Sequence, residues 1–583
     1  MINISPFRQL WSIFTKDQRR VAIFLLFYML VGMALETLGI GLVIPILSLI
    51  IEPNYISQYP LLSPWIGKLG NPSHEVLVII SILLLVFIYL IKAMFLAFLV
   101  WRTTRFLYEF LANVSERLFS GYIYRPYSFH LFRNSAELIR NVIGQVNTIT
   151  SVTQQSFLLL AEIMIITGIS TLLLFIEPFG AFLVMFVFFC SSFVFHYFTK
   201  DRVLRWGKER QYHDGFRIQH AQQGFGGIKD IKILGREKGF IDQYKVHNIA
   251  HSKISQRAVV LQALPRLWTE LLLVIGLAVL VLAVVFQGKS LNILLPILGV
   301  FAAAAFRLMP SVNRIIVAVQ SIRYSMPVIK TIYDELNESR VKVIPSDDIP
   351  FNDELKFDRV SFSYPHSNNK AIDNVSIVIK KGTSIGIIGG SGSGKTTLID
   401  IILGLFKPES GYVYVDGIDI QNGIQNWQKN IGYVPQSIYL SDDTLRSNIA
   451  FGIAKNEIND DAVWRAIRSA KLENYINELP DGIDTIVGER GVRISGGQCQ
   501  RVGIARALYH NPSVLVLDEA TSSLDTKTEA EIMSAIDTYR GEKTIITIAH
   551  RLSTVKNCDY IYRLRKGSLI EKGNSSVILE NLN

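Results

Sequence analysis

Residues 389–397 read GGSGSGKTT, and this stretch decides the fold of the C-terminal half of the chain. It fits the pattern G-x-x-x-x-G-K-[ST], with Gly389, Gly394, Lys395 and Thr396 in register. Glycines in such a loop let backbone amides approach phosphate oxygens without a side-chain clash. The apolar run 384–388 predicts a buried strand before the loop, and residues 395–405 have helical spacing after it. The stretch therefore predicts a phosphate-binding loop at a helix N-terminus.

Three further motifs follow in a fixed order: ISGGQ (494–498), VLVLDEATSSLD (514–525) and AH (549–550). The apolar run VLVL predicts a buried strand that ends at two adjacent carboxylates, Asp518 and Glu519. The formation of a helix or a strand does not by itself require this set of motifs. It is what a chain needs to surround phosphates with amides, hold Mg²⁺ and polarise a water molecule.

Length and composition indicate more than one domain. At 583 residues the chain is too long for a single core, and hydrophobic residues, 49% of the total, crowd into the first 320 positions. The net charge of +10 lies beside these apolar segments, so we do not expect nucleic acid as a partner. The three cysteines, Cys190, Cys499 and Cys558, are far apart and form no metal-binding spacing.

The N-terminal half contains six candidate membrane spans. Each supplies about 20 mostly apolar residues, the length that a bilayer requires. The segments are 21–51, 76–101, 152–176, 179–199, 268–286 and 291–317.

The loops between these spans predict their orientation. Loop 102–150 carries six Lys and Arg residues and loop 200–265 carries thirteen, whereas loop 52–75 has only Lys68. Positive charge collects on the cytoplasmic side, so both termini and the phosphate-binding half are expected in the cytoplasm. The polar stretch 336–352, with two prolines, predicts a linker between a membrane domain (1–335) and a nucleotide-binding domain (353–583).

The motifs and the spans together resemble a half-transporter of the ABC exporter type over essentially the whole chain. The resemblance implies an all-α transmembrane domain of six helices, followed by an α/β P-loop nucleotide-binding domain. It also implies an ATPase that uses ATP and Mg²⁺ to drive transport across the membrane.

The same resemblance implies a role for each motif residue. Glu519 would polarise the attacking water, while His550 and Gln436 would contact or sense the γ-phosphate. The implied Mg²⁺ ligands are Thr396, Gln436 and Asp518. The implied ATP-binding residues are Tyr364 (stacking on adenine), Gly389, Ser391, Gly392, Gly394, Lys395, Thr396, Thr397, Ser495, Gly496, Gly497, Gln498 and Asp525. Ile494 and Cys499 depart from the commonest residues of the signature, but neither removes a phosphate contact.

One chain supplies one nucleotide-binding domain, whereas the family's composite site takes its signature from a second domain. All motifs are intact in this sequence, and symmetric closure is the commoner outcome for oligomers. We therefore expect a homodimer with two ATP sites.

Basic residues inside the spans point to the cargo. Charges at such positions are costly and are candidates for function. We single out Lys92 and Arg307 within spans and Arg266 near the inner edge of the fifth span, with Glu36, Glu162 and Glu270 as acidic counterparts. Arg266 would equally well reach the inner lipid headgroups. For Lys92 and Arg307 the alternatives are an intramembrane ion pair or the wall of a cytoplasm-facing cavity, and we favour binding.

Three stretches, 307–316, 227–237 and 263–268, resemble bacterial lipid-linked oligosaccharide flippases of the PglK type. The resemblance implies that a polyprenyl-pyrophosphate-linked glycan crosses the bacterial inner membrane with its pyrophosphate held by Lys92, Arg266 and Arg307. It also implies that the outer segment 59–70 contacts the lipid tail as a short amphipathic helix. Alternatives are an exporter of lipid A, a drug or a peptide and, in another class, an ATP-gated channel or regulator.

Overall fold

The computed structural model describes residues 6–42, 46, 49, 73–176, 178–286, 291–338, 349–365, 367, 369–488, 491–520, 526–549 and 551–580. The chain divides into two compact units. The first comprises Met1–Arg125 and Phe132–Val341, and the second comprises Pro126–Leu131 and Lys342–Asn583. The predicted outer helix at 59–70 lies outside the described residues.

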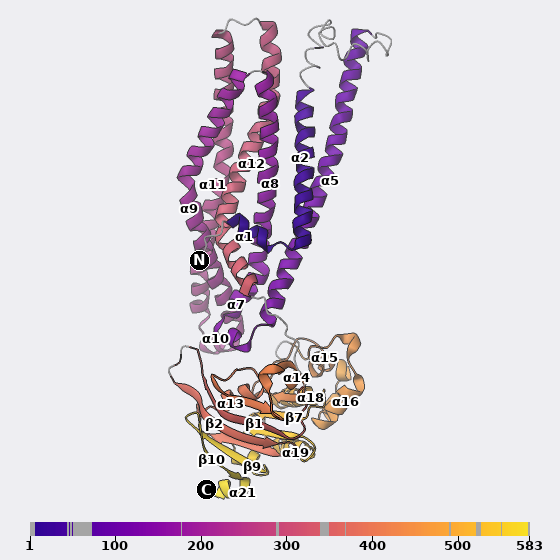
Figure 1. Cartoon of the computed structure of the whole chain (residues 1–583), viewed down its shortest axis with the longest axis vertical. Helices are drawn as coiled ribbons and strands as arrows, with labels where there is room; N and C mark the ends of the chain where they lie inside the picture. The colour runs from indigo at the N-terminus through magenta and orange to yellow at the C-terminus, as the bar shows by residue number, and fades with distance from the viewer. Residues whose placement is uncertain are drawn as a thin grey trace. The chain divides into compact units, whose positions relative to one another are not determined.

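The first unit is built from long helices that run alongside one another (Figure 1). Its elements are α1 (Pro6–Ile13), α2 (Lys16–Gly41), α5 (His74–Ile123), α7 (Ser135–Ile139), the π-helical turn η2 (Arg140–Gln145), α8 (Val146–Ile176), α9 (Pro178–Gly226), α10 (Ile228–Leu234), α11 (Glu237–Phe286) and α12 (Leu291–Glu338). Helix α2 begins at a capping box, in which Thr15 and Gln18 bond each other's backbone N–H groups.

Four of the described helical segments are long and apolar enough to cross a membrane: Lys16–Gly41, His74–Ile123, Ser135–Phe175 and Leu308–Glu338. The segments expected at 179–199 and 268–286 lie in α9 and α11, where many side chains are outside the described part of the chain. Helix α8 ends at Ile176 and α9 begins at Pro178.

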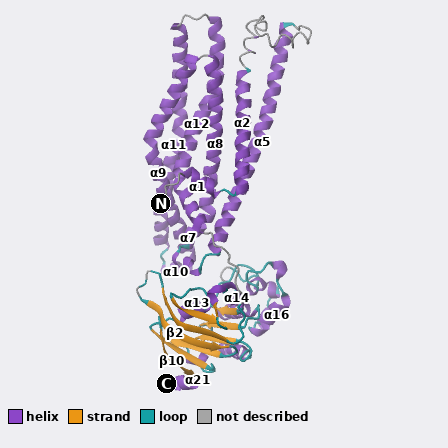
Figure 2. Ribbon diagram, viewed as in Figure 1, coloured by secondary structure: helices purple, strands orange, loops and turns teal. Residues whose placement is uncertain are grey.

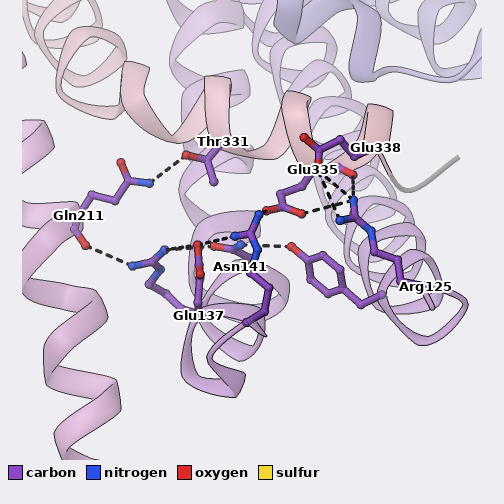
Figure 3. Close-up of polar contacts among 10 residues, drawn as sticks. Arg125, Glu137, Asn141, Gln211, Thr331, Glu335 and Glu338 are labelled. Carbon is purple, nitrogen blue, oxygen red and sulfur yellow. Dashed lines mark hydrogen bonds and ion pairs between the residues drawn. The ribbon is translucent and has the colours of Figure 1, made fainter. Parts of the chain in front are cut away.

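A network of polar contacts joins residues of different elements of this unit (Figure 3). Arg125, which follows the end of α5, is paired with Glu335 and Glu338 of α12, at N···O distances of 3.7 and 3.4 Å. Gln211 of α9 donates a hydrogen bond to Thr331 Oγ1, and Asn141 of η2 donates one to Tyr122 Oη. Because their partners belong to different helices, these contacts fix the helix ends relative to one another.

The second unit contains two sheets (Figure 2). The first has the antiparallel order β2-β1-β4-β5, with β1 (Glu354–Ser363), β2 (Lys370–Lys380), β4 (Ser410–Val415) and β5 (Ile418–Asp419). The second has the order β10-β9-β3-β8-β7-β6, with β3 (Ser384–Gly389), β6 (Ile431–Val434), β7 (Val514–Asp518), β8 (Thr544–Ile548), β9 (Tyr560–Arg565) and β10 (Ser568–Asn574). Only the β9–β10 pair of this sheet is antiparallel.

Helices and 3-10 turns complete the second unit. They are α13 (Lys395–Ile402), η3 (Ile420–Asn422), α14 (Ile424–Lys429), α15 (Leu445–Ile449), η4 (Lys455–Glu457), α16 (Asp460–Ser469), α17 (Glu473–Asn477), η5 (Gly482–Asp484), α18 (Gly496–Leu508), α19 (Thr526–Asp537), α20 (Leu552–Val555) and α21 (Ser575–Glu580). One core cluster joins both sheets to α13 and includes Phe357, Ile387, Leu398 and Trp427. The α/β fold class predicted for this half is confirmed.

A short segment from the N-terminal half belongs to the second unit. Residues Pro126–Leu131 contain most of helix α6 (Tyr127–Phe132), and the Tyr127 ring packs against Phe406 with centroids 5.8 Å apart. Burial raises the pKa of the Tyr127 hydroxyl, and the nearby Asp400 carboxylate raises it further. This segment of loop 102–150 therefore belongs to the second unit, against which it packs at the surface.

Candidate nucleotide-binding site

The phosphate loop connects β3 to α13, as the sequence predicts. Its geometry requires glycine at two positions, because Gly392 and Gly394 have φ values of +73° and +100°. A Cβ atom on Gly394 would lie 2.6 Å from the carbonyl oxygen of Ala371, a distance that no real Cβ accepts. The predicted helix 395–405 ends at Ile402, because Gly404 takes a left-handed conformation with φ of +69°.

The Lys395 side chain lies inside this loop. Its ammonium group donates hydrogen bonds to the carbonyl oxygens of Gly389 and Gly390, at 2.8 and 3.1 Å, and the residue is buried. Ser393 is also buried, and its hydroxyl has no hydrogen-bond partner among the described residues. A buried cation beside an unsatisfied hydroxyl fits a phosphate group. Ser393 was not among the predicted site residues, although its position inside the phosphate-loop motif could have indicated it.

The carboxylates predicted to act on Mg²⁺ and water lie at the end of β7. Strand β7 is parallel to β8, which is parallel to β3, so Asp518, Glu519 and the phosphate loop follow the carboxyl ends of strands at one edge of the sheet. Gln436 Nε2 donates a hydrogen bond to Glu519 Oε2 at 2.6 Å. Glu519 has a left-handed φ of +48°, an uncommon conformation for a residue with a side chain.

The surroundings of Asp518 are acidic and partly buried. Tyr433 Oη donates a hydrogen bond to Asp518 Oδ2 at 3.3 Å. Burial raises the pKa of Asp400, on α13, to about 6, and the charge of Asp518 contributes to the shift. Burial also raises the pKa of Tyr433, with smaller effects from the same two carboxylates. Two neighbouring carboxylates disfavour each other's ionisation, and a divalent cation bound between them would relieve this repulsion.

Tyr364, predicted to stack on adenine, packs edge-on against Phe362 and Phe406, at centroid distances of 5.3 and 5.6 Å. Its hydroxyl lies 3.0 Å from Thr397 Oγ1, which links the ring to α13. Thr397 is buried, whereas Ser391 and Thr396 are exposed. Adenine stacking on Tyr364 stays a prediction.

The signature residues begin helix α18. Ser495 and Gln498 form a capping box, with the Ser495 N–H donating to Gln498 Oε1 at 2.8 Å. Open space surrounds the position of a Cβ on Gly496, and Gly497 follows it in the first turn. His550 and Asp525 lie outside the described residues, so their assignment stays a prediction.

The predicted cargo residues fall into different environments in the first unit. Lys92 Nζ lies 2.8 Å from Glu36 Oε2, and both side chains are nearly buried. Arg266 Nε lies 3.1 Å from Glu270 Oε1 on the same helix. The side chain of Arg307 lies outside the described part of the chain. The roles of all three in binding stay predictions.

One further ion pair was not predicted. Arg314 Nη1 of α12 lies 2.6 Å from Glu162 Oε1 of α8. Glu162 had been noted only as an acidic position within a span. The sequence could have indicated Arg314 as a candidate, because it lies seven residues after Arg307 and hence on a similar face of the helix.

Comparisons with known proteins match both halves. A family profile described as "ABC transporter" matches residues 372–522, and one described as "ABC transporter transmembrane region" matches residues 38–309. The ATP-dependent lipid A-core flippase of Saccharophagus degradans is 30% identical over 482 residues, covering 81% of this chain and 80% of the flippase. That of Nitrosococcus oceani is 28% identical over 481 residues, covering 80% and 78%.

A solved structure shows the same fold. The "bacterial Atm1-family ABC exporter with ATP bound" superposes with a TM-score of 0.80 at 22% identity, covering 97% of each chain.

A phosphate loop, strand-end carboxylates and a signature helix, in one chain with long apolar helices, define an ATP-binding ATPase coupled to transmembrane transport. The chain belongs to the ABC transporter family, and it has the exporter arrangement of a membrane half followed by an ATPase half. The predicted ABC transporter family and fold class are thereby confirmed.

Proposed function

We propose that this ATP-driven exporter moves a polyprenyl-pyrophosphate-linked oligosaccharide from the inner to the outer leaflet of a bacterial inner membrane. The observation that supports a phosphate-bearing cargo is the exposure of Arg266, whose side chain is 72% exposed at the edge of a predicted span, and the resemblance of stretches 307–316, 227–237 and 263–268 favours the glycan carrier. A cation at such a position is costly unless it meets water or an anion. A pyrophosphate headgroup supplies such an anion.

Lipid A is the second candidate cargo. The curated relatives that match about 80% of the chain carry the name lipid A-core flippase. Lipid A and the glycan carrier both present phosphate groups, so an exposed arginine does not discriminate between them. The discriminating experiment measures ATPase stimulation of the purified protein in liposomes by each lipid. Stimulation by the glycan-linked lipid alone supports the first cargo, and stimulation by lipid A alone supports the second.

The site supports hydrolysis that depends on Mg²⁺. Asp518, Thr396 and Gln436 would hold the ion, which when bound neutralises charge on the β- and γ-phosphates. Gln436 orients one carboxylate oxygen of Glu519 through the hydrogen bond between them. Glu519 would then accept a hydrogen bond from the attacking water, and Lys395 would turn from its loop carbonyls to the phosphates.

A second copy of the chain would complete each ATP site. The helix that begins at Gly496 has an open N-terminal turn, and N–H groups at a helix N-terminus attract a phosphate. We propose a homodimer in which Ser495, Gly496 and Gly497 of one protomer meet the γ-phosphate bound to the other. Both termini and the ATPase domain would lie in the cytoplasm, in agreement with the basic loops.

A further inference from the structure

Helix α18 buries an amide side chain that has no hydrogen-bond partner. Gln500 is 3% exposed, and neither its Nε2 nor its Oε1 atom has a partner among the described residues. Most buried polar side-chain atoms in proteins have at least one partner, so an amide that is unpaired at both ends requires an explanation. The described arrangement leaves Gln500 with one donor group and one acceptor group still to be satisfied.

A second buried amide in the same part of the chain is fully paired. Asn448, in α15, is buried, and its Nδ2 donates hydrogen bonds to the carbonyl oxygens of Ser441 and Thr444, both at 3.0 Å. Its Oδ1 accepts a hydrogen bond from the Ser441 N–H at 3.0 Å. Both ends of the Asn448 amide therefore hold the loop before α15 in place. Neither end of Gln500 has such a contact with the described residues.

Gln500 belongs to the face of α18 that packs on strand β6 and on the loop after it. Residues three, four and seven apart share one face of a helix, so Gln500, Gly503 and Ala507 lie on the same face. A Cβ atom on Gly432, in β6, would collide with the Ala507 carbonyl oxygen, and one on Gly503 would collide with the Ile438 side chain. These close approaches fix how this face of α18 lies on the sheet.

The same two contacts give the direction of α18 along the sheet. The chain runs from Gly432 to Ile438 past the carboxyl end of β6, while the contacted position on α18 moves back from Ala507 to Gly503. Gln500 lies nearly one further turn toward the start of the helix, about 4.5 Å beyond Gly503. It therefore lies at the edge of the sheet where the neighbouring strands β6 and β7 have their carboxyl ends.

This edge carries the two residues expected to act on water and the γ-phosphate. Gln436 follows β6 and Glu519 follows β7, and the two strands are parallel neighbours. Ala520, directly after Glu519, is buried in the same apolar cluster as Ile504 and Ala507 of α18. The loop that holds the expected general base therefore packs on the helix face to which Gln500 belongs.

We propose that Gln500 is a positioning residue for ATP hydrolysis, whose amide bridges the loops after β6 and β7 when Mg²⁺ and ATP bind. An amide has a donor end and an acceptor end, so it can bond backbone groups of two loops at once. Because a buried unpaired amide is costly, an arrangement that pairs it is favoured over the described one. The inference rests on the proposed role of Glu519 and not on the identity of the cargo.

The test compares Gln500→Met with wild type, both as full-length purified protein. Methionine fills a similar space without polar ends, so without nucleotide the variant should have a Tm about 3 °C higher. Mg²⁺ with a non-hydrolysable ATP analogue should raise the Tm of the variant by less than it raises that of wild type. In steady-state ATP hydrolysis the kcat should fall about tenfold, while the KM for ATP changes less than about twofold. Gln500→Leu is a second apolar variant with the same expectations.

Two control variants show what the measurements report. Gln421→Met, in η3, removes an amide whose Nε2 is likewise buried without a partner among the described residues, but η3 packs against β4 and α14. It should leave the kcat and the Tm shift caused by the analogue unchanged. Asn448→Leu removes an amide that is paired at both ends, so it should lower the Tm in the absence of nucleotide.

Two results would overturn the inference. A lower Tm without nucleotide in both Gln500 variants would mean that the amide already has partners. An unchanged kcat, together with a wild-type Tm shift on binding the analogue, would mean that the side chain has only a structural role. Glu519→Gln, measured in parallel, separates the inference from the proposed function. Wild-type hydrolysis by Glu519→Gln refutes the general base on which the inference rests, whereas its loss beside normal hydrolysis by Gln500→Met refutes only the positioning role.

Discussion

Gln436 and Glu519 are joined by a hydrogen bond of 2.6 Å between Nε2 and Oε2, although 83 residues separate them in sequence. The bond fixes one oxygen of the carboxylate that follows the buried strand β7. A general base must have a defined direction toward its water molecule. The pair therefore links the residue expected to sense the γ-phosphate to the residue expected to act on water.

Glu519→Gln should reduce steady-state ATP hydrolysis at least about a hundredfold, the range expected for loss of a general base. ATP binding should persist, because Lys395 and the loop glycines are unchanged. Phosphate release and nucleotide binding by the purified protein measure the two effects. Hydrolysis within twofold of wild type would remove Glu519 from this role.

Gly394→Ala should destabilise the second unit by about 2 kcal/mol, through backbone strain and a clash with the Ala371 carbonyl. Gly390→Ala is the matched control in the same loop, since a Cβ there meets nothing within 4 Å. The free energy of unfolding, measured on nucleotide-free protein, compares the two variants. Equal losses of stability would contradict the described loop geometry.

Asp400→Asn should stabilise the nucleotide-free protein at neutral pH. The pKa of Asp400 is raised to about 6 in the folded state, so the folded protein binds this proton more tightly than the unfolded chain. Its contribution to stability is therefore lost as pH rises from about 4 to above 6. The asparagine variant should show a flatter dependence of Tm on pH across this window, measured with EDTA present. Parallel curves for the variant and wild type would argue against the shift.

Lys92→Met should destabilise the membrane unit by about 3 kcal/mol, because it removes the lysine cation that lies beside the nearly buried Glu36 carboxylate. The double variant with Glu36→Leu should recover most of that loss, since it removes both charges. Thermal unfolding in detergent measures both. If the double variant is as unstable as the single one, the ion pair is not the tie between α2 and α5.

The sequence predicted those parts of the site that depend on local spacing. The strand expected at 384–388 is β3, and the strand expected from the VLVL run is β7. The loop glycines, Lys395 and the two strand-end carboxylates all lie where their motif places them. These features are predictable because each is encoded within about ten consecutive residues.

Contacts between distant segments were not predictable in the same way. Glu36 and Lys92 were both noted, but helical spacing on single segments does not reveal that they face each other. The pairing of Arg314 with Glu162 was not predicted, because the two residues lie 152 positions apart in the sequence. The contact between Tyr127 and Phe406 joins residues 279 positions apart in the sequence, and no local pattern specifies it.

The most direct measurement of the central claim is ATP-dependent translocation of a polyprenyl-pyrophosphate-linked glycan in proteoliposomes, followed by its protection from an external glycosidase. Wild-type protein should protect the glycan when ATP and Mg²⁺ are added, and Glu519→Gln protein should not. Lipid A with a surface-accessible label is measured in parallel. Protection of lipid A without protection of the glycan, or no difference between wild type and Glu519→Gln, would contradict the account.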